Sequence, residues 1–314
     1  MSTLRHVPVF HAFGHRQGED SLMMQLLAPK NDDIVIDCTL GLAGHAKAFL
    51  EKTAPAGHLY GLDADADNIA LANENLSDFQ SRCTLIHSNF RHLPELHLPP
   101  ANIIFADLGL SSAHVDDPER GFSFRTEGPL DLRFDRSTGI TAAEYIAQTN
   151  ESDLKYMFRR FGELKEANRI AHALFAAARH EVLRTTTDLV RVCDETFGYR
   201  APALLPQIFQ ALRMQVNDEL GALEKLLATA PYMLKPGGRF GIITFHSLED
   251  RLVKRTFKNL AQPEIDEITG QIRTAAPFDL LTRKPLTPTA GEISLNPRAR
   301  SAHFRAIIRT EQTA

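Results

Sequence analysis

The sequence contains few of the residues that cross-link a protein or hold a metal ion. Its 314 residues include three cysteines, Cys38, Cys83 and Cys193, which lie far apart and share no CxxC spacing. Neither a disulfide framework nor a cysteine zinc site follows from them. The 13 histidines do not form the H-x-E pattern of zinc deaminases. We therefore expect no metal site.

Long apolar runs are also absent. No run approaches the roughly 18 residues that a membrane span requires, and the first ten residues, MSTLRHVPVF, lack the charged start and apolar core of a secretory signal. We expect a cytoplasmic protein. The formal net charge of −4 gives no general attraction to nucleic acid, so an RNA partner would have to bind a local basic surface.

The chain has no internal repeat and no low-complexity tract, and its 43% hydrophobic and 24% charged residues are ordinary for a globular protein. Residues 33 to 107 alternate short apolar runs with helix-like stretches, which is typical of a parallel α/β sheet. The expected strands are Ile34 to Asp37, Leu59 to Asp63, Thr84 to His87 and Ile103 to Asp107. Helices are expected at residues 46–52 and 67–76. Three of the four strands end in aspartate.

A different pattern begins at about residue 116 and continues to about residue 205. A loop rich in glycine, proline and charge precedes four helical segments, at residues 142–148, 152–161, 166–181 and 187–197, and no convincing strand occurs there. The sequence therefore predicts an inserted all-helical domain at residues 116–205. The sheet domain is then discontinuous and comprises residues 1–115 and 206–314.

The α/β pattern resumes at Pro206. A long helix to about Tyr232 is expected first, followed by the turn KPGG at residues 235–238 and a strand at residues 240–245. A helix at residues 248–260, an irregular segment at residues 263–290 and a final strand at residues 302–309 complete the expected fold.

A loop with small residues, DCTLGLAGH at Asp37 to His45, follows the first strand. Ligands of open α/β sheets bind outside the carboxyl ends of the strands, where small residues let a backbone approach them. Such loops also bind nicotinamide or flavin dinucleotides, or merely turn the chain.

Two details favour S-adenosylmethionine. The G-x-G-x-x-G pattern that cradles a pyrophosphate is missing, and Asp63 ends the second strand, where a carboxylate would accept hydrogen bonds from ribose hydroxyls. A solvated aspartate at a strand end is the alternative for Asp63.

The third and fourth strands add two further candidates. Phe90 either stacks on adenine or belongs to the core. Asp107 opens the loop DLGLSS, which stands where amino-group methyltransferases place a short polar loop beside the transferred methyl group. A carboxylate at that position can orient an exocyclic amine by accepting its hydrogen bonds.

Taken together, the chain resembles the bacterial 16S ribosomal RNA (cytosine-N4) methyltransferase H family. The shared strings, in chain order, are HVPV at residues 6–9, DCTLGLAGH, DLGLSS, DDPERGFSF at residues 116–124, GPLDLRFD at residues 128–135, FGE at residues 161–163, FQALRMQVNDEL at residues 209–220, LKPGGR, FHSLEDRLVK at residues 245–254 and NPRARS at residues 296–301. The resemblance implies a class I S-adenosylmethionine-dependent methyltransferase with a Rossmann-like sheet and an inserted all-helical domain for RNA recognition.

The resemblance further implies methylation of the N4 amine of a cytidine in the decoding region of 16S rRNA, within the small ribosomal subunit. By motif position, the cofactor contacts it implies are Ala43, Gly44, His45, Asp63, Phe90, Asp107 and His114. The residues expected to orient the acceptor amine are Asp107, Ser111, Ser112 and His246. The oligomeric state stays open, with a homodimer among the candidates.

The chain departs from the family at three of these positions. Cys38 and Ala43 stand where the family has glycine, and His114 stands where glutamine is common. Alanine at position 43 permits a close backbone approach if its φ is negative, whereas a conformation reserved for glycine would be lost. The segment at residues 10–20 also departs from the family.

Three other segments have two interpretations each. In DDPERGFSF, Arg120 and Arg125 either reach RNA phosphates or belong to a surface loop whose aromatic residues pack inward. His246 and Ser247 follow a strand and are expected to orient the base, since no nucleophile elbow supports a hydrolase. The basic runs at residues 251–258 and 298–309 either follow an RNA backbone or are solvated surfaces.

Two further hypotheses remain beside the methyltransferase. The chain could be a cofactor-binding module without turnover, a hypothesis based on Cys38 and Ala43, which stand where the family has glycine. It could also be a divergent relative that acts on another RNA base amine. A nicotinamide oxidoreductase is disfavoured by the missing pyrophosphate pattern.

Overall fold

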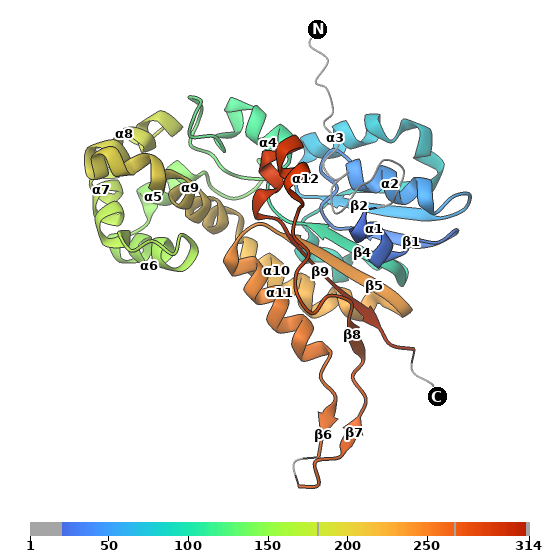
Figure 1. The fold of residues 1–314 in the computed structure, drawn as a ribbon. Coiled ribbons are helices and arrows are strands. Elements are labelled where there is room, and N and C mark those ends of the chain that lie inside the picture. Colours follow the sequence, from blue (N-terminus) through green and yellow to red (C-terminus); the bar gives the residue numbers. More distant parts are fainter. Residues whose placement is uncertain (1–20, 181, 267, 312–314) are drawn as a thin grey trace. The chain divides into compact units, whose positions relative to one another are not determined.

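The computed structural model describes residues 21–180, 182–266 and 268–311 (Figure 1). These residues divide into two compact units. The sheet unit runs up to Gly109 and again from Ala222, and the helical unit runs from Leu110 to Gly221. The predicted boundaries at residues 115/116 and 205/206 therefore lie inside the helical unit. The shared string at residues 6–9 and the divergent segment at residues 10–20 lie outside the described residues.

The main sheet of this unit joins seven described strands in the order β3, β2, β1, β4, β5, β9, β8 (Figure 1). Their bounds are β1 (Ile34–Asp37), β2 (His58–Asp63), β3 (Cys83–His87), β4 (Ala101–Asp107), β5 (Leu234–Thr244), β8 (Phe278–Leu280) and β9 (His303–Arg309). Strands β1 to β5 are parallel, β9 is antiparallel to β5, and β8 is antiparallel to β9. The order 3-2-1-4-5 is that of a doubly wound sheet. The predicted α/β fold class is confirmed.

The central strands are buried on both faces, which explains why they are continuous apolar runs. Alternate residues of β4 contribute to different core clusters: Ile103 and Phe105 to one, Ile104 and Ala106 to the other. The first cluster is completed by α1 (Leu22–Leu27), α2 (Gly44–Lys52) and α3 (Ala66–Asn75), and the second by α10 (Glu219–Thr229) and α11 (Ser247–Leu260). Helices therefore cover both faces of the sheet and leave its strand ends for ligands.

Strand β5 contains the turn that the sequence predicts at residues 235–238. Leu234 pairs with Ala101 and Arg239 with Ile103, so the intervening residues bulge from the ladder. Gly237 has a φ of 75° there, a value that glycine adopts readily.

The segment at residues 263–290, predicted to be irregular, contains short strands. Besides β8, it forms β6 (Glu264–Ile265) and β7 (Ile272–Thr274), which pair as an antiparallel hairpin. The helix α12 (Ala290–Leu295) follows. Strands of two or three residues are too short to show periodicity, and this explains why the sequence does not reveal them.

The helical unit comprises α4 (Ser112–Asp116), α5 (Ala142–Gln148), α6 (Glu151–Phe161), α7 (Ala167–Arg179), α8 (Thr186–Phe197) and α9 (Ala201–Asn217). The helices predicted from residue 142 to residue 197 agree with α5 to α8 within two residues at each end. Capping boxes open α5 at Thr141 and α8 at Thr185. Within its described residues, this unit forms no named strand.

The long helix predicted from Pro206 to Tyr232 is two helices. Helix α9 starts before Pro206 and ends at Asn217, and Asp218 has a left-handed conformation with φ 46° and ψ 50° before α10 begins. The buried face of α9 includes Ile208 and Leu212, which belong to the core of the helical unit. This packing explains why the unit boundary lies after α9. No helix among the described residues is long and apolar enough to cross a membrane.

Candidate active site

Three aspartates end neighbouring strands of the sheet. Asp37, Asp63 and Asp107 are the last residues of β1, β2 and β4, and β1 lies between the other two strands. The carboxyl ends of parallel strands meet at one edge of a sheet, and ligands of open α/β sheets bind there. This edge is therefore the candidate site of the sheet unit.

The loop after β1 is held against β2 by Asp63. The Gly41 N–H donates to Asp63 Oδ2 at 2.8 Å, and the Asp65 N–H donates to Asp63 Oδ1 at 2.8 Å. The Leu40 N–H donates to the Leu62 carbonyl at 2.8 Å. These contacts fix the orientation of the Asp63 carboxylate and give it a structural role beside its predicted role in holding the ribose.

Ala43 has the conformation that the usual glycine would favour. Its φ of 64° and ψ of 24° are left-handed, and it is the N-cap of α2 without a side-chain hydrogen bond. For a residue with a Cβ, such angles cost roughly 1–2 kcal/mol. The loop thus adopts left-handed angles at Ala43 at the expense of backbone strain. Gly44 and His45, both predicted cofactor contacts, are the first two residues of α2.

His45 lies beside Asp107. Its Nδ1 is 3.9 Å from Asp107 Oδ2, and its ring meets Phe105 edge-on with centroids 4.7 Å apart. Burial lowers the pKa of His45 to about 3. The imidazole is therefore neutral near pH 7, and its contact with Asp107 is not an ion pair.

Asp107 has a buried oxygen atom with no hydrogen-bond partner. Its backbone N–H donates to Thr39 Oγ1 at 2.5 Å, whereas Oδ1 has no partner among the described residues. Burial, with the nearby carboxyls of Asp37 and Glu249, raises the pKa of Asp107 well above its usual value. A ligand with a positive charge or a hydrogen-bond donor would satisfy this group.

Asp37 is the third aspartate of this edge, and the sequence analysis did not assign it to the site. It is fully buried, its Oδ1 accepts from the Thr39 N–H at 3.1 Å, and its Oδ2 has no partner within the described residues. Burial, with a contribution from Asp63, raises the pKa of Asp37 to about 7. An acidic residue at the end of a buried strand is the sequence signal that reveals it.

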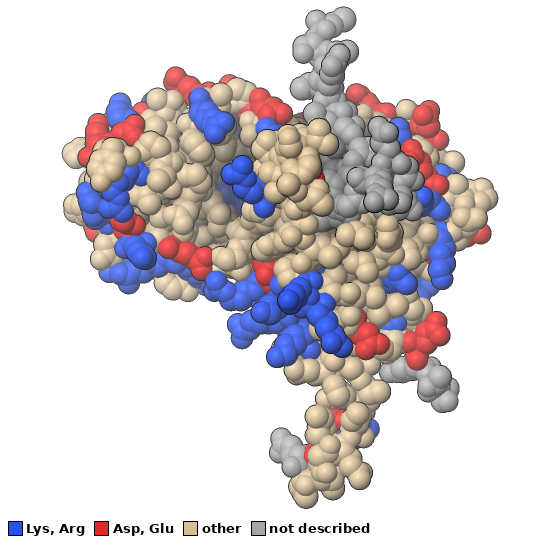
Figure 2. Space-filling model, in the orientation of Figure 1, with Lys and Arg blue, Asp and Glu red and all other residues tan. Residues whose placement is uncertain are grey.

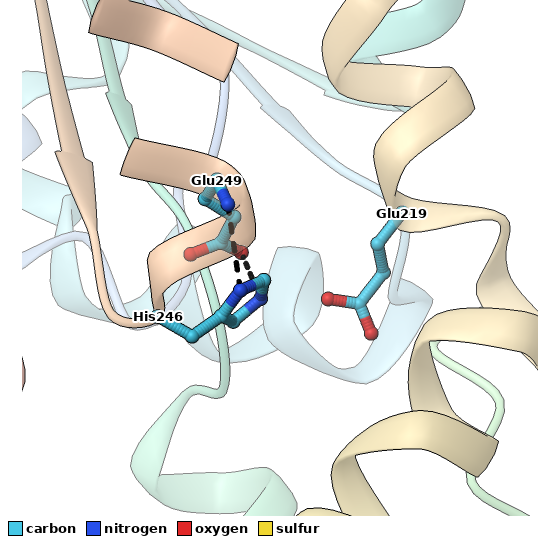
Figure 3. Close-up of side chains that lie close together, drawn as sticks. All are labelled: Glu219, His246 and Glu249. Carbon is cyan, nitrogen blue, oxygen red and sulfur yellow. Dashed lines mark hydrogen bonds and ion pairs between the residues drawn. The ribbon is translucent and has the colours of Figure 1, made fainter. Parts of the chain in front are cut away.

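His246 caps helix α11. Its Nδ1 accepts from the Glu249 N–H at 3.4 Å, and its Nε2 lies 3.0 Å from Glu249 Oε1 (Figure 3). Glu249 Oε2 also accepts from the Phe245 N–H at 2.9 Å. Glu249 is buried, with 3% of its surface exposed. His246 therefore has a clear structural role at the end of β5, and its role in orienting the acceptor base stays a prediction.

Phe90 begins the 3₁₀ segment Phe90–Leu96, after the N-cap Asn89. It is half-buried and packs against the core cluster that contains Ile36 and Leu62. The contact of Phe90 with adenine stays a prediction.

Ser111, Ser112 and His114 belong to the helical unit. Ser111 is the N-cap of α4, and it forms a reciprocal capping box with His114, with both bonds at 3.2 Å. The His114 ring is buried beside Phe122 and Phe134, with centroids 5.1 Å and 5.2 Å away. The cofactor contact predicted for His114 stays a prediction.

The structure corrects the first interpretation of the string DDPERGFSF. Arg120 is buried, and its guanidinium donates to the carbonyls of Arg133 and Phe134 at 3.1 Å and 2.8 Å. Phe122 is buried as well, whereas Arg125 is exposed. Arg120 thus holds the loop together and is not a surface arginine that reaches phosphates.

Comparisons with known proteins agree with the sequence resemblance. The MraW methylase family matches residues 15–310. The chain is 39% identical over 304 residues to the ribosomal RNA small subunit methyltransferase H of Symbiobacterium thermophilum, which covers 92% of this chain and 94% of the relative. It is 40% identical over 309 residues to the protein of the same name from Syntrophotalea carbinolica, with 95% and 98% covered.

Replacing Ala43 by glycine tests the strain in the loop. Because glycine removes the penalty of the left-handed angles but loosens the unfolded chain, we expect Ala43→Gly to raise the free energy of unfolding by about 0.5–1 kcal/mol. The same change at Ala48, inside α2, is the control and should lower it by roughly 0.5–1 kcal/mol or more. Urea denaturation measures both, and a loss of stability in Ala43→Gly would contradict the strain.

The pH dependence of stability tests the buried carboxyl of Asp37. Its pKa is higher in the folded than in the unfolded chain, so the folded state binds more protons between about pH 4 and pH 7, and stability falls as the pH rises through that range. Asp37→Asn mimics the protonated form. We expect the variant to gain stability relative to the original protein, by a few kcal/mol, as the pH is raised from 4 to 8. Urea unfolding at several pH values measures it, and a difference that does not change with pH would show that Asp37 titrates normally.

Proposed function

The chain belongs to the MraW methylase family, and from that premise we propose that it transfers a methyl group from S-adenosylmethionine to 16S ribosomal RNA. The acceptor is the N4 amine of a cytidine in the decoding region, presented on the small ribosomal subunit. The relatives' printed name supports the class of RNA, and the family resemblance of the sequence supports the position of the amine.

The buried carboxyl groups at the sheet edge are the observation that carries the proposal. Asp37 and Asp107 each have a buried oxygen without a hydrogen-bond partner within the described residues, and burial raises the pKa of both. A cationic ligand with amino groups fits such a donor-poor, acidic edge. S-adenosylmethionine carries both a sulfonium and an ammonium group, and when bound it supplies the methyl group on that sulfonium.

The loop from Asp37 to His45 and the end of β2 would hold this cofactor. Asp63 is fixed by the Gly41 and Asp65 amides and would accept hydrogen bonds from the ribose. Ala43, Gly44 and His45 would line the approach of the backbone to the cofactor. Phe90 would contact the adenine.

Asp107 would position the acceptor amine. Its Oδ1 accepts a hydrogen bond from the N4 amine and aims the nitrogen lone pair, which is otherwise delocalised into the ring. Once the nitrogen–carbon bond has formed, the amine must lose one proton. A carboxyl group whose pKa is raised by burial is better suited to hold that proton than an exposed one.

Neutral His45 would limit the side-chain rotation of Asp107, because its ring lies beside Asp107 and packs against Phe105. Ser111, Ser112, His114 and His246 keep their predicted roles at the acceptor and cofactor as proposals that rest on the sequence motifs.

The helical unit would recognise the RNA that flanks the target. Methylation of a base amine inside folded RNA requires the base to leave its stack, so the flanking strand must be held while one nucleotide enters the site. A cytoplasmic location follows from a ribosomal substrate. A homodimer and the lack of a resident metal stay predictions.

Two alternatives remain open: a cofactor-binding module without turnover, and a divergent relative that acts on another RNA base amine. Ala43 gives the first no structural support, because it adopts left-handed backbone angles that glycine would also adopt.

Asp107→Asn tests the role of the sheet edge. We expect methyl transfer to undermethylated small subunits to fall by roughly 10²–10⁴-fold, because asparagine cannot hold the proton and presents a donor as well as an acceptor. Tritium transfer at saturating S-adenosylmethionine measures the rate. Calorimetry sets the saturating concentration for the variant, because a changed carboxyl at this edge also weakens binding of the cationic cofactor.

The control for this experiment is Asp279→Asn, which changes an exposed carboxylate on β8 of the same unit and should leave transfer unchanged. Undiminished transfer by Asp107→Asn would refute the placement of the amine. Cofactor binding without transfer in the unmodified protein would instead support the binding module.

A further inference from the structure

Helix α11 has a basic stripe along one side. Four exposed residues at the spacing i, i+3, i+4 and i+7 form it: Arg251, Lys254, Arg255 and Lys258. At about 100° per residue, they occupy an arc roughly 100° wide. The opposite side of the helix carries Val253 and Phe257, which are buried in the core of the sheet unit. The stripe therefore faces solvent, and Figure 2 shows basic side chains gathered over α11.

The charge of this stripe is not neutralised by its own helix. The two acidic residues of α11 are engaged elsewhere: Glu249 is buried and accepts from the Phe245 N–H. Asp250 binds the buried Arg305 of β9 through both oxygens, at 2.7 Å and 3.0 Å. Across the described residues, no ion pair involves Lys254, Arg255 or Lys258.

A helix that is only solvated commonly mixes charges of both signs along its exposed face. The α11 stripe has one sign, in a chain whose net charge is −4. Its concentration of positive charge is thus a local property of the surface and does not follow from composition.

The stripe starts close to the proposed active site. Helix α11 begins directly after β5, at the same edge of the sheet as Asp37 and Asp107, and His246 is its N-cap. From Arg251 to Lys258 the helix rises about 10 Å. An RNA strand whose base enters the strand edge could therefore lay its neighbouring phosphates along the stripe.

We propose that the α11 stripe binds the phosphates of the RNA strand that carries the acceptor base. This inference rests on the proposed function and adds the surface that holds the substrate. Lysine and arginine supply the salt-sensitive, sequence-independent part of RNA binding.

Two other partners fit the stripe less well. A membrane-surface helix needs its apolar face for the lipid, and the apolar face of α11 is covered by the sheet unit. An acidic protein partner is disfavoured because the cores of protein interfaces are depleted of lysine.

Three charge-neutralising substitutions made together, Lys254→Gln, Arg255→Gln and Lys258→Gln, test the stripe. All three side chains are exposed, so the fold should survive, which thermal unfolding checks. The control variant carries Lys30→Gln, Lys52→Gln and Lys225→Gln in the sheet unit, which are exposed and change the net charge by the same amount. Binding to undermethylated small subunits and to protein-free 16S rRNA is measured from about 0.05 to about 0.3 M salt.

For the stripe variant we expect the slope of log affinity against log salt to become shallower by about 2, and the affinity near 0.1 M salt to fall about tenfold to 100-fold. The control variant should have the salt slope and the RNA affinity of the original protein. The affinity for S-adenosylmethionine, measured by calorimetry, should be the same for all three proteins.

An unchanged salt slope in the stripe variant, while the original protein still methylates RNA, would overturn this inference and leave the proposed function intact. Weaker binding to subunits with unchanged binding to protein-free rRNA would also overturn it and would identify an acidic ribosomal protein as the partner. An original protein that binds and methylates no RNA would refute the proposed function itself.

Discussion

The candidate site depends on carboxyl groups that the fold buries without giving them enough hydrogen-bond donors. Strands β1 and β4 lie in the centre of a sheet covered on both faces, so their terminal residues lose most of their contact with water: Asp37 is fully buried, and 20% of the Asp107 side chain is exposed. Burial of an unpaired carboxylate is costly, and both groups respond with a raised pKa. The loop from Asp37 to His45, the neutral His45 side chain and a cationic cofactor are all consistent with carboxyl groups that are buried without enough hydrogen-bond donors.

The sequence predicts most of the fold because the relevant signals are local. Apolar runs that end in aspartate identify the central strands, and helical periodicity with capping residues identifies α5 to α8. The sequence does not reveal that α9 belongs to the helical unit, since this depends on which core its apolar face joins. Pro206 looked like the start of a helix but lies inside one.

The site was predicted less completely, for physical reasons that differ between residues. The motifs identify Asp63 and Asp107, but only the three-dimensional contacts show that Asp63 fixes the Gly41 loop and that Asp37 joins Asp107 at the edge. Arg120 shows the opposite error, because an arginine in a charged loop was expected at the surface and is buried as a donor to backbone carbonyls. Side-chain burial is a tertiary property that residue patterns do not contain.

Proton release on cofactor binding tests the central claim most directly. If buried, partly protonated carboxyls accept the cofactor, its positive charge must favour their ionised forms and release protons into the buffer. Calorimetric titration with S-adenosylmethionine near pH 7, in two buffers of different ionisation enthalpy, counts these protons. The account predicts release on the order of half to one proton per cofactor. Binding with no exchange of protons would contradict it.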